Sequence, residues 1–200
     1  ITSYYGNKGV GKFPEKNKPI SLDSDIDIKG ELLNFKETNE LLEALLLSVY
    51  TPTKYIKEEC KKKYIEKYSL KGKHGGDMSF DVQSRGMIVL HRFNLFKRLE
   101  SSVFSFEETL RRLLERIERT EQLLLKGSGE VDQEDADFDD SGDDGVYIEG
   151  KYEIDVRDLR IDDYLEDLAS DKYIIAEIHK NARKILEEER DRKLIDLKEI

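Results

Sequence analysis

Apolar residues recur along most of the chain at a spacing of three or four residues, which is typical of amphipathic helices. The strongest run steps by three and four without interruption, as in a heptad repeat. It predicts one long helix over about residues 87–125. The seam of this helix would be Phe96, Leu99, Val103, Phe106, Leu110, Leu113, Ile117, Thr120 and Leu124. Two interpretations stay open for the seam, namely core packing within one helical domain and a self-associating coiled coil.

Shorter helices are predicted on both sides of this segment. Residues 37–50 carry leucines at helical spacing, and Thr51-Pro52 then predicts a stop and a new start, with Pro52 in the first turn of a helix that runs to about Tyr68. After residue 158 the helical spacing returns in two stretches, and Asp171 is expected to cap the second. Residues 146–156 are consistent with either a short hairpin or an irregular linker.

These patterns predict a mainly α protein, a helical bundle built on one long helix with at most a minor β-hairpin. We expect residues 1–30 to be an extended connector, 31–126 a helical module, 127–145 an acidic disordered loop, and 146–200 the C-terminal helices. The sequence is still helical and apolar at intervals up to Ile200, without a stop signal. The chain therefore looks like a piece of a longer protein.

Charge is concentrated in one insert. Nine acidic residues and no basic one lie between Gly129 and Gly145, which leaves a net charge of −1 for the rest of the chain. Like charges with few apolar residues predict disorder. Asp135, Asp137 and Asp139 alternate as in a calcium loop, but the sixth position is not Gly and the twelfth is not Glu, so no calcium site is expected.

Motifs for catalysis or cofactor binding were also sought. Gly6 to Phe13, GNKGVGKF, has the outline of a phosphate-binding loop, but Phe13 replaces the hydroxyl that would hold Mg²⁺ and Pro14 disfavours a following helix. The three histidines are scattered and the chain has a single cysteine. We therefore predict no catalytic residue, metal, cofactor or small-molecule substrate in this segment. The sequence shows no signal peptide or membrane span, so we expect a soluble, cytoplasmic protein.

Basic residues follow the predicted long helix as a stripe. Arg98, Arg112 and Arg119 share one heptad position, and Arg116 lies beside them. Such a stripe, about 30 Å long, could follow the backbone of duplex DNA. Glutamates four residues before several of these arginines are also spaced for ion pairs, which predicts a solvated face instead.

Residues 92–110, RFNLFKRLESSVFSFEETL, resemble a segment of large bacterial Swi/Snf-like helicases, with Phe93 and Phe96 as hydrophobic exchanges. SYYG, GKFPEKNKPI, LLSVYTPTKYI and RDRKLIDLKEI resemble flanking family segments in the same order, although Lys16 replaces the usual Arg. The matching positions of the central segment are Arg92, Asn94, Leu95, Lys97, Arg98, Leu99, Glu100, Ser101, Ser102, Phe106, Thr109 and Leu110.

The resemblance implies a structural or regulatory helical module between the two RecA-like motor lobes of an ATP-driven DNA translocase. ATP and Mg²⁺ would then bind the lobes, outside this segment, and the partners would be these lobes and duplex DNA. Two other classes remain, a free-standing helical adaptor or coiled-coil protein and an enzyme with an unrecognised site. The candidate residues for contact with DNA or a lobe are Arg92, Lys97, Arg98, Ser101, Arg112, Arg116 and Arg119.

Overall fold

The computed structural model describes residues 25–68, 80–127, 130–133 and 152–198. The mainly helical fold predicted from the sequence is confirmed. The helices are α2 (Phe35–Ala44), α3 (Glu58–Tyr68), α4 (Phe80–Ser101), α5 (Val103–Lys126), α6 (Ile161–Glu187) and α7 (Arg192–Lys198). Short 3₁₀ helices are η1 (Ser48–Tyr50), η2 (Pro52–Tyr55) and η3 (Val156–Asp158), and the strands are β1 (Glu130–Gln133) and β2 (Tyr152–Asp155).

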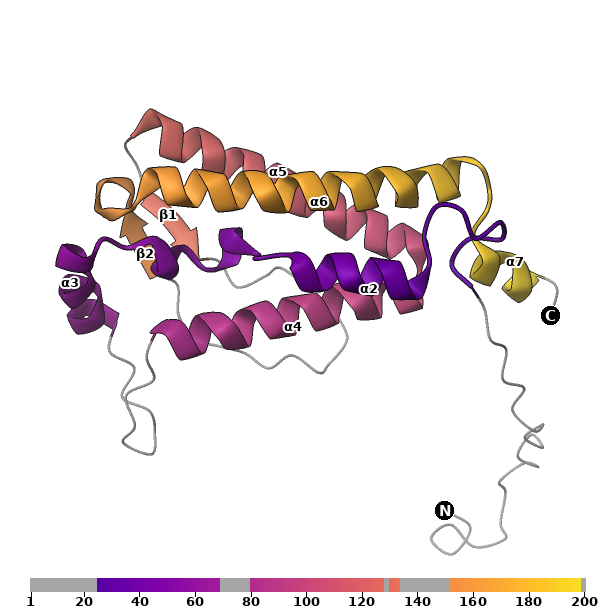
Figure 1. The fold of residues 1–200 in the computed structure, drawn as a ribbon, viewed down its shortest axis with the longest axis horizontal. Helices are drawn as coiled ribbons and strands as arrows, with labels where there is room; N and C mark the ends of the chain where they lie inside the picture. The colour runs from indigo at the N-terminus through magenta and orange to yellow at the C-terminus, as the bar shows by residue number, and fades with distance from the viewer. Residues whose placement is uncertain (1–24, 69–79, 128–129, 134–151, 199–200) are drawn as a thin grey trace, which may run out of the picture.

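The helices form an elongated body (Figure 1). α5 and α6 lie side by side along it, α4 and α2 pack below them, α3 lies at one end and α7 at the other. The heptad seam forms much of the core, because Phe96 is partly buried and the other eight positions are buried. α6 supplies the opposing face with residues such as Leu168, Ile175 and Ile185. The seam is therefore used in packing within the chain.

The prediction of one long helix over residues 87–125 is wrong. α4 ends at Ser101, and Ser102 adopts an extended backbone with φ −163° and ψ 130° before α5 begins. The Ser102 hydroxyl accepts a hydrogen bond from Ser105 N at 3.3 Å, which caps the new helix. At this point the chain reverses, so that α5 runs back over α4 (Figure 1). Among the helices of the described residues, α6 is the longest, with 27 residues.

Other helix boundaries also differ from the prediction. α2 ends at Ala44, and the chain then passes through Leu47 in a left-handed conformation (φ 52°) into η1. Thr51 and Pro52 do start a helix, but it is the short η2, and α3 begins separately. Asp171 does not cap a second C-terminal helix, because it lies inside α6 and is buried.

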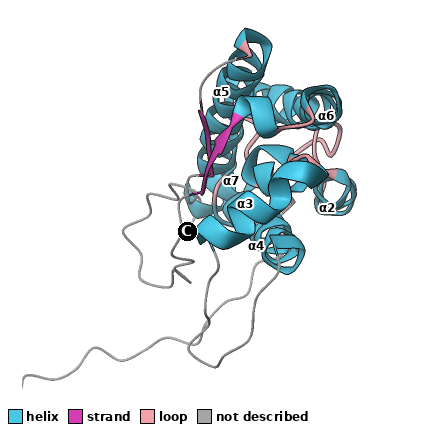
Figure 2. Cartoon of the chain, turned by 90° about the vertical axis from the view of Figure 1, so that its left-hand side faces the viewer, coloured by secondary structure: helices cyan, strands magenta, loops and turns pink. Residues whose placement is uncertain are grey.

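The two strands form an antiparallel ladder on one side of the helices (Figure 2). The register places Glu130 opposite Asp155 and Gln133 opposite Tyr152. Glu130–Gln133, at the start of the acidic insert, are thus a strand and not part of a disordered loop. They pair with β2, which follows the insert. This pairing is neither the hairpin within residues 146–156 nor the irregular linker that the sequence suggested. The predicted disorder of residues 134–145 and the predicted connector at residues 1–24 fall outside the described residues.

Candidate functional site

The first and last described parts of the chain meet at one end of the body (Figure 1). Asp27 and Asp191 form an isolated antiparallel bridge. Ile28 N donates to Arg190 O at 3.1 Å, and Arg192 N donates to Ile26 O at 3.2 Å. The backbone that enters the helical body is therefore hydrogen-bonded to the backbone that leaves α6.

A buried ion pair reinforces this junction. Arg190 Nε and Nη2 donate to Asp27 Oδ1 and Oδ2 at 2.7 and 2.6 Å, and the two residues are only 3% and 1% exposed. Nη2 also donates to Glu31 at 3.0 Å, and Nη1 donates to Glu188 at 3.0 Å. We call these four residues, Asp27, Glu31, Glu188 and Arg190, the clasp. Its planar, bidentate geometry is the strongest form of an arginine–carboxylate pair.

The residues that follow Asp27 in the sequence hold its carboxylate in place. Its carboxylate also accepts hydrogen bonds from the backbone N–H groups of Lys29, Glu31 and Leu32 at 3.2, 2.9 and 3.1 Å. The turn that brings these groups together uses Gly30 in the left-handed region, at φ +64°. Burial alone would raise the pKa of Asp27, but the hydrogen bonds from Arg190 and the backbone outweigh it and lower the pKa to about 2. Asp27 is therefore ionised at neutral pH.

The surface part of the Lys97–Ser102 motif lies near the clasp. Lys97 and Ser101 are exposed. Lys97 Nζ donates to Glu100 at 2.6 Å and lies 5.6 Å from the centre of the Phe93 ring. Lys193 of α7 donates to the backbone oxygen of Glu100 at 2.5 Å, which ties the end of α4 to the helix that follows the clasp. The structure thus brings this part of the motif and the junction to one end of the body.

Arg92 is an internal support and not a surface contact. Its guanidinium donates to the backbone oxygen of Leu45, with Nε at 3.1 Å. From the other side, Asp171 accepts from Leu46 N and from the backbone N and hydroxyl of Ser48, each at 2.7 Å. Arg92 and Asp171 together hold the left-handed connector between α2 and η1.

Arg116 is also turned toward the interior. Its guanidinium lies 4.7 Å from the centre of the Tyr50 ring. The imidazole of His91 stacks on the same ring, with centroids 3.8 Å apart and an interplanar angle of 13°. His91 is 2% exposed, and burial together with the nearby Arg116 charge lowers its pKa to about 4. This buried aromatic and cationic layer was not predicted from the sequence.

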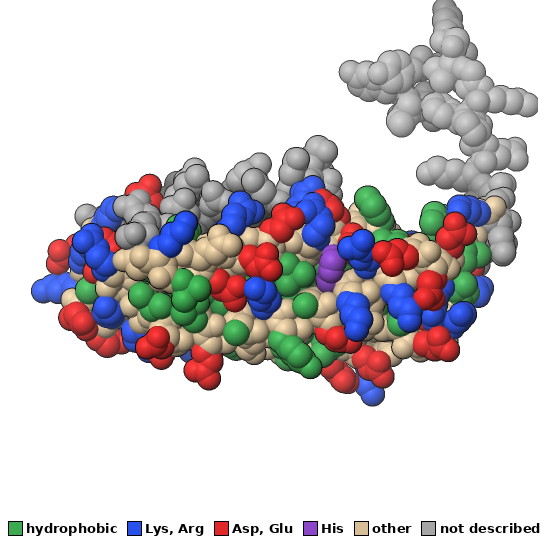
Figure 3. Space-filling model, turned by 90° about the horizontal axis from the view of Figure 1, so that it is seen from above, with side chains coloured by type: hydrophobic (Ala, Val, Ile, Leu, Met, Phe, Trp, Pro, Cys, Tyr) green, Lys and Arg blue, Asp and Glu red, His purple; other side chains and the backbone are tan. Residues whose placement is uncertain are grey.

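The remaining arginines of the predicted stripe are compensated or partly covered. Arg112 pairs with Glu108 at 3.1 Å, and Arg119 Nε donates to the backbone oxygen of Glu115 at 3.3 Å. Arg98 is partly buried. Lys and Arg side chains are interspersed with Asp and Glu on the face seen in Figure 3. The solvated-face interpretation therefore describes this surface better than a continuous basic stripe.

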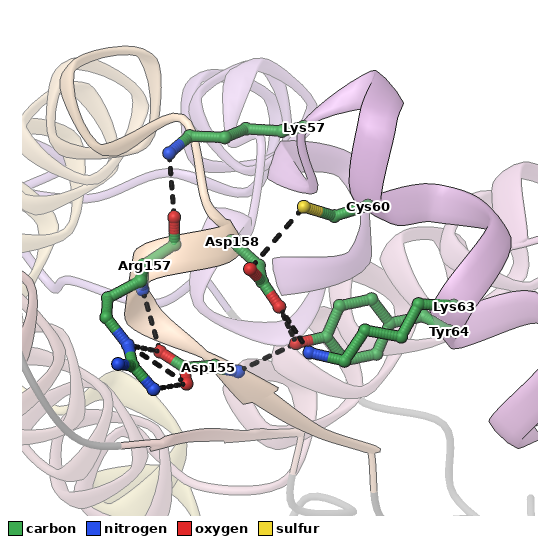
Figure 4. A network of polar contacts seen from close by, with 7 residues as sticks. All are labelled: Lys57, Cys60, Lys63, Tyr64, Asp155, Arg157 and Asp158. Carbon is green, nitrogen blue, oxygen red and sulfur yellow. Dashed lines mark hydrogen bonds and ion pairs between the residues drawn. The ribbon is translucent and has the colours of Figure 1, made fainter.

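A second polar cluster lies at the end of the body opposite the clasp (Figure 4). Asp158 accepts from Lys63 Nζ and Tyr64 OH, both at 2.7 Å, and from Cys60 Sγ at 3.4 Å. Burial, together with the hydrogen bond to Asp158, raises the pKa of the Cys60 thiol. Cys60 is therefore a protonated donor here, as expected for a structural cysteine and not for a nucleophile.

Two further properties of the described residues concern ligands and membranes. They contain no group of three or more His, Cys, Asp or Glu side chains placed to hold a metal ion. No helix in the described part of the chain combines the length and apolar character needed to cross a bilayer. Comparison with protein-family models, with curated proteins and with solved structures gave no match in any of the three.

Proposed function

We propose that this chain is a structural helical module that sets the relative position of two RecA-like motor lobes in a Swi/Snf-like ATP-dependent DNA translocase. The observation that carries the proposal is the clasp. It fastens the segment entering the helical body to the segment leaving it, through Asp27 and Arg190 and two backbone hydrogen bonds. The proposed relation to the Swi/Snf-like family rests on the sequence resemblance alone.

The clasp suits a spacer between two domains. A protein segment that leaves one domain and returns beside its own starting point behaves as an insertion, and its two connections keep a defined separation. A flexible linker would let the flanking domains adopt many orientations. A buried, bidentate ion pair with backbone hydrogen bonds around it restricts them to few. The junction is therefore suited to fixing domain geometry.

The surface near the clasp favours contact with a lobe over contact with DNA. Lys97 and Ser101 lie near this junction and have no role in the buried core. Arg92 and Arg116 are engaged inside the chain, and Arg112 is paired with Glu108. These three candidate arginines are therefore already engaged within the chain. A coiled-coil adaptor is also disfavoured, because the heptad seam packs within the chain.

Two steps test this proposal. Translating the DNA on both sides of the coding region should show a RecA-like lobe on each side, and the absence of both lobes would contradict it. In the full-length protein, Lys97→Ala with Ser101→Ala should lower DNA-stimulated ATP hydrolysis at least severalfold without changing the melting temperature. Lys62→Ala, an exposed lysine at the opposite end, is the matched control and should leave the rate unchanged. Equal rates in the wild type, the double variant and the control would show that Lys97 and Ser101 do not contact a lobe.

A further inference from the structure

α3 is held to the body differently from the central helices. α5 and α6 each bury seven residues. In residues 58–67, by contrast, Tyr64 is the one buried side chain, at 2% exposure, and Cys60 is partly buried. One aromatic ring supplies far less apolar burial than the seams of the central helices. The position of α3 must therefore depend strongly on polar contacts.

Three of these polar contacts converge on one carboxylate, and a separate exposed ion pair joins Lys67 of α3 to Glu153 of β2 at 3.8 Å. Asp158 collects hydrogen bonds from Lys63, Tyr64 and Cys60, and all three donors belong to α3 (Figure 4). The Tyr64 hydroxyl also accepts from Asp155 N at 3.0 Å, so the same side chain connects α3 to β2. The side chain of Asp158 is 19% exposed, whereas that of Lys63 is 62% exposed. Loss of this one carboxylate would remove an acceptor that three donors of α3 share.

The backbone before α3 is fixed independently of Asp158's side chain. Ile56 and Leu159 form an antiparallel bridge, Lys57 N donates to Asp158 O at 2.9 Å, and Arg160 N donates to Tyr55 O at 2.8 Å. The segment before α3 therefore has an anchor of main-chain hydrogen bonds that no side-chain substitution removes. Lys57 O also accepts from Cys60 N at 2.9 Å and Lys61 N at 3.1 Å, so movement of α3 would have to begin within its first turn and would leave this anchor in place.

We propose that α3 is a releasable arm, docked on the helical body by the ionised carboxylate of Asp158. This inference is independent of the proposed role in a translocase. With the carboxylate neutralised, the Tyr64 ring remains as the main buried attachment of the arm. Within the described part of the chain, the charged and titratable groups that face Asp158 are Lys63, Tyr64 and Cys60 of α3 and Arg157 of its own segment. The Lys63 and Tyr64 hydrogen bonds keep the pKa of Asp158 below its usual value, so the docked form is expected at neutral pH.

Hydrogen–deuterium exchange measured by mass spectrometry on the whole chain tests this inference. Asp158→Asn should speed exchange of the α3 amides about tenfold or more, because hydrogen bonds to a charged acceptor are lost. Exchange in α5 and α6 should stay at the wild-type rate. Asp163→Asn is the matched control. Asp163 lies five residues after Asp158, and its exposed carboxylate pairs with Arg160 and not with α3. It should leave α3 exchange unchanged.

Tyr64→Phe provides a second, milder variant. It keeps the buried ring and removes the hydroxyl that joins Asp158 to β2, so α3 exchange should rise by less than in Asp158→Asn. Acceleration confined to α3 in both variants supports the releasable arm. If α3 exchange is unchanged in Asp158→Asn, the carboxylate does not dock the helix. If α3, α5 and α6 accelerate together, α3 is an integral part of the body and the inference is wrong.

Discussion

Arg190 and Asp27 are 163 positions apart in the sequence, yet their side chains form two hydrogen bonds of 2.7 and 2.6 Å. Removing one partner of such a buried pair leaves the other charge without full compensation. Asp27→Asn should therefore lower the free energy of unfolding by roughly 3–5 kcal/mol, measured by urea denaturation of the isolated chain. Asp25→Asn, two residues away and exposed, should change it by less than about 0.5 kcal/mol. Equal stability of the two variants would mean that the clasp does not hold the ends together.

The seam gives a prediction about the core. Leu99 is 3% exposed, so Leu99→Ala should lower the free energy of unfolding by about 2–5 kcal/mol. Phe104 is 64% exposed on the neighbouring helix, and Phe104→Ala should have little effect. Thermal or urea unfolding of both variants measures the difference. A stable Leu99→Ala protein would show that the seam is not the main source of packing energy.

The buried imidazole predicts a pH dependence. The pKa of His91 falls from 6.5 to about 4 on folding, so between these values the unfolded chain binds more protons. Stability from this group is fully present above pH 6.5 and is lost as the pH falls toward 4. Between pH 7 and 5 the loss should be about 2 kcal/mol.

His91→Phe provides the control for this pH dependence. Phenylalanine can keep the stack on Tyr50 but cannot titrate. Urea denaturation at pH 7, 6 and 5 should therefore show a smaller loss of stability in the variant than in the wild type. The same pH slope in both proteins would mean that other groups cause it.

Features set by local periodicity were predictable from the sequence. The seam residues from Leu99 to Leu124 were predicted to form one packing stripe, in the core or in a coiled coil, and they are buried within the chain. The reversal at Ser102 was missed because the three-and-four spacing continues through it, so the apolar pattern carries no sign of the turn. The signal was present in Ser101-Ser102, since serine competes for backbone hydrogen bonds and favours helix caps.

Features set by distant contacts were not predictable in the same way. No local pattern links Asp27 to Arg190, and periodicity places Arg92 and Arg116 on helix faces without showing which neighbours cover them. One signal could have been used. Asp171 lies three residues after Leu168 and four before Ile175, on the apolar stripe of α6, and a carboxylate in such a position must be buried with partners.

In the proposed function, the clasp gives the module a fixed geometry relative to the domain before it. A flexible Gly-Ser linker of about ten residues, inserted between Ser24 and Asp25 of the full-length protein, would leave the clasp intact and free that domain to reorient. The same linker between Ser141 and Gly142 of the acidic insert is the control. The decisive measurement is the rate of DNA-stimulated ATP hydrolysis. We expect a severalfold fall for the first insertion and the wild-type rate for the control, whereas wild-type rates in both proteins would show that the clasp does not fix this geometry.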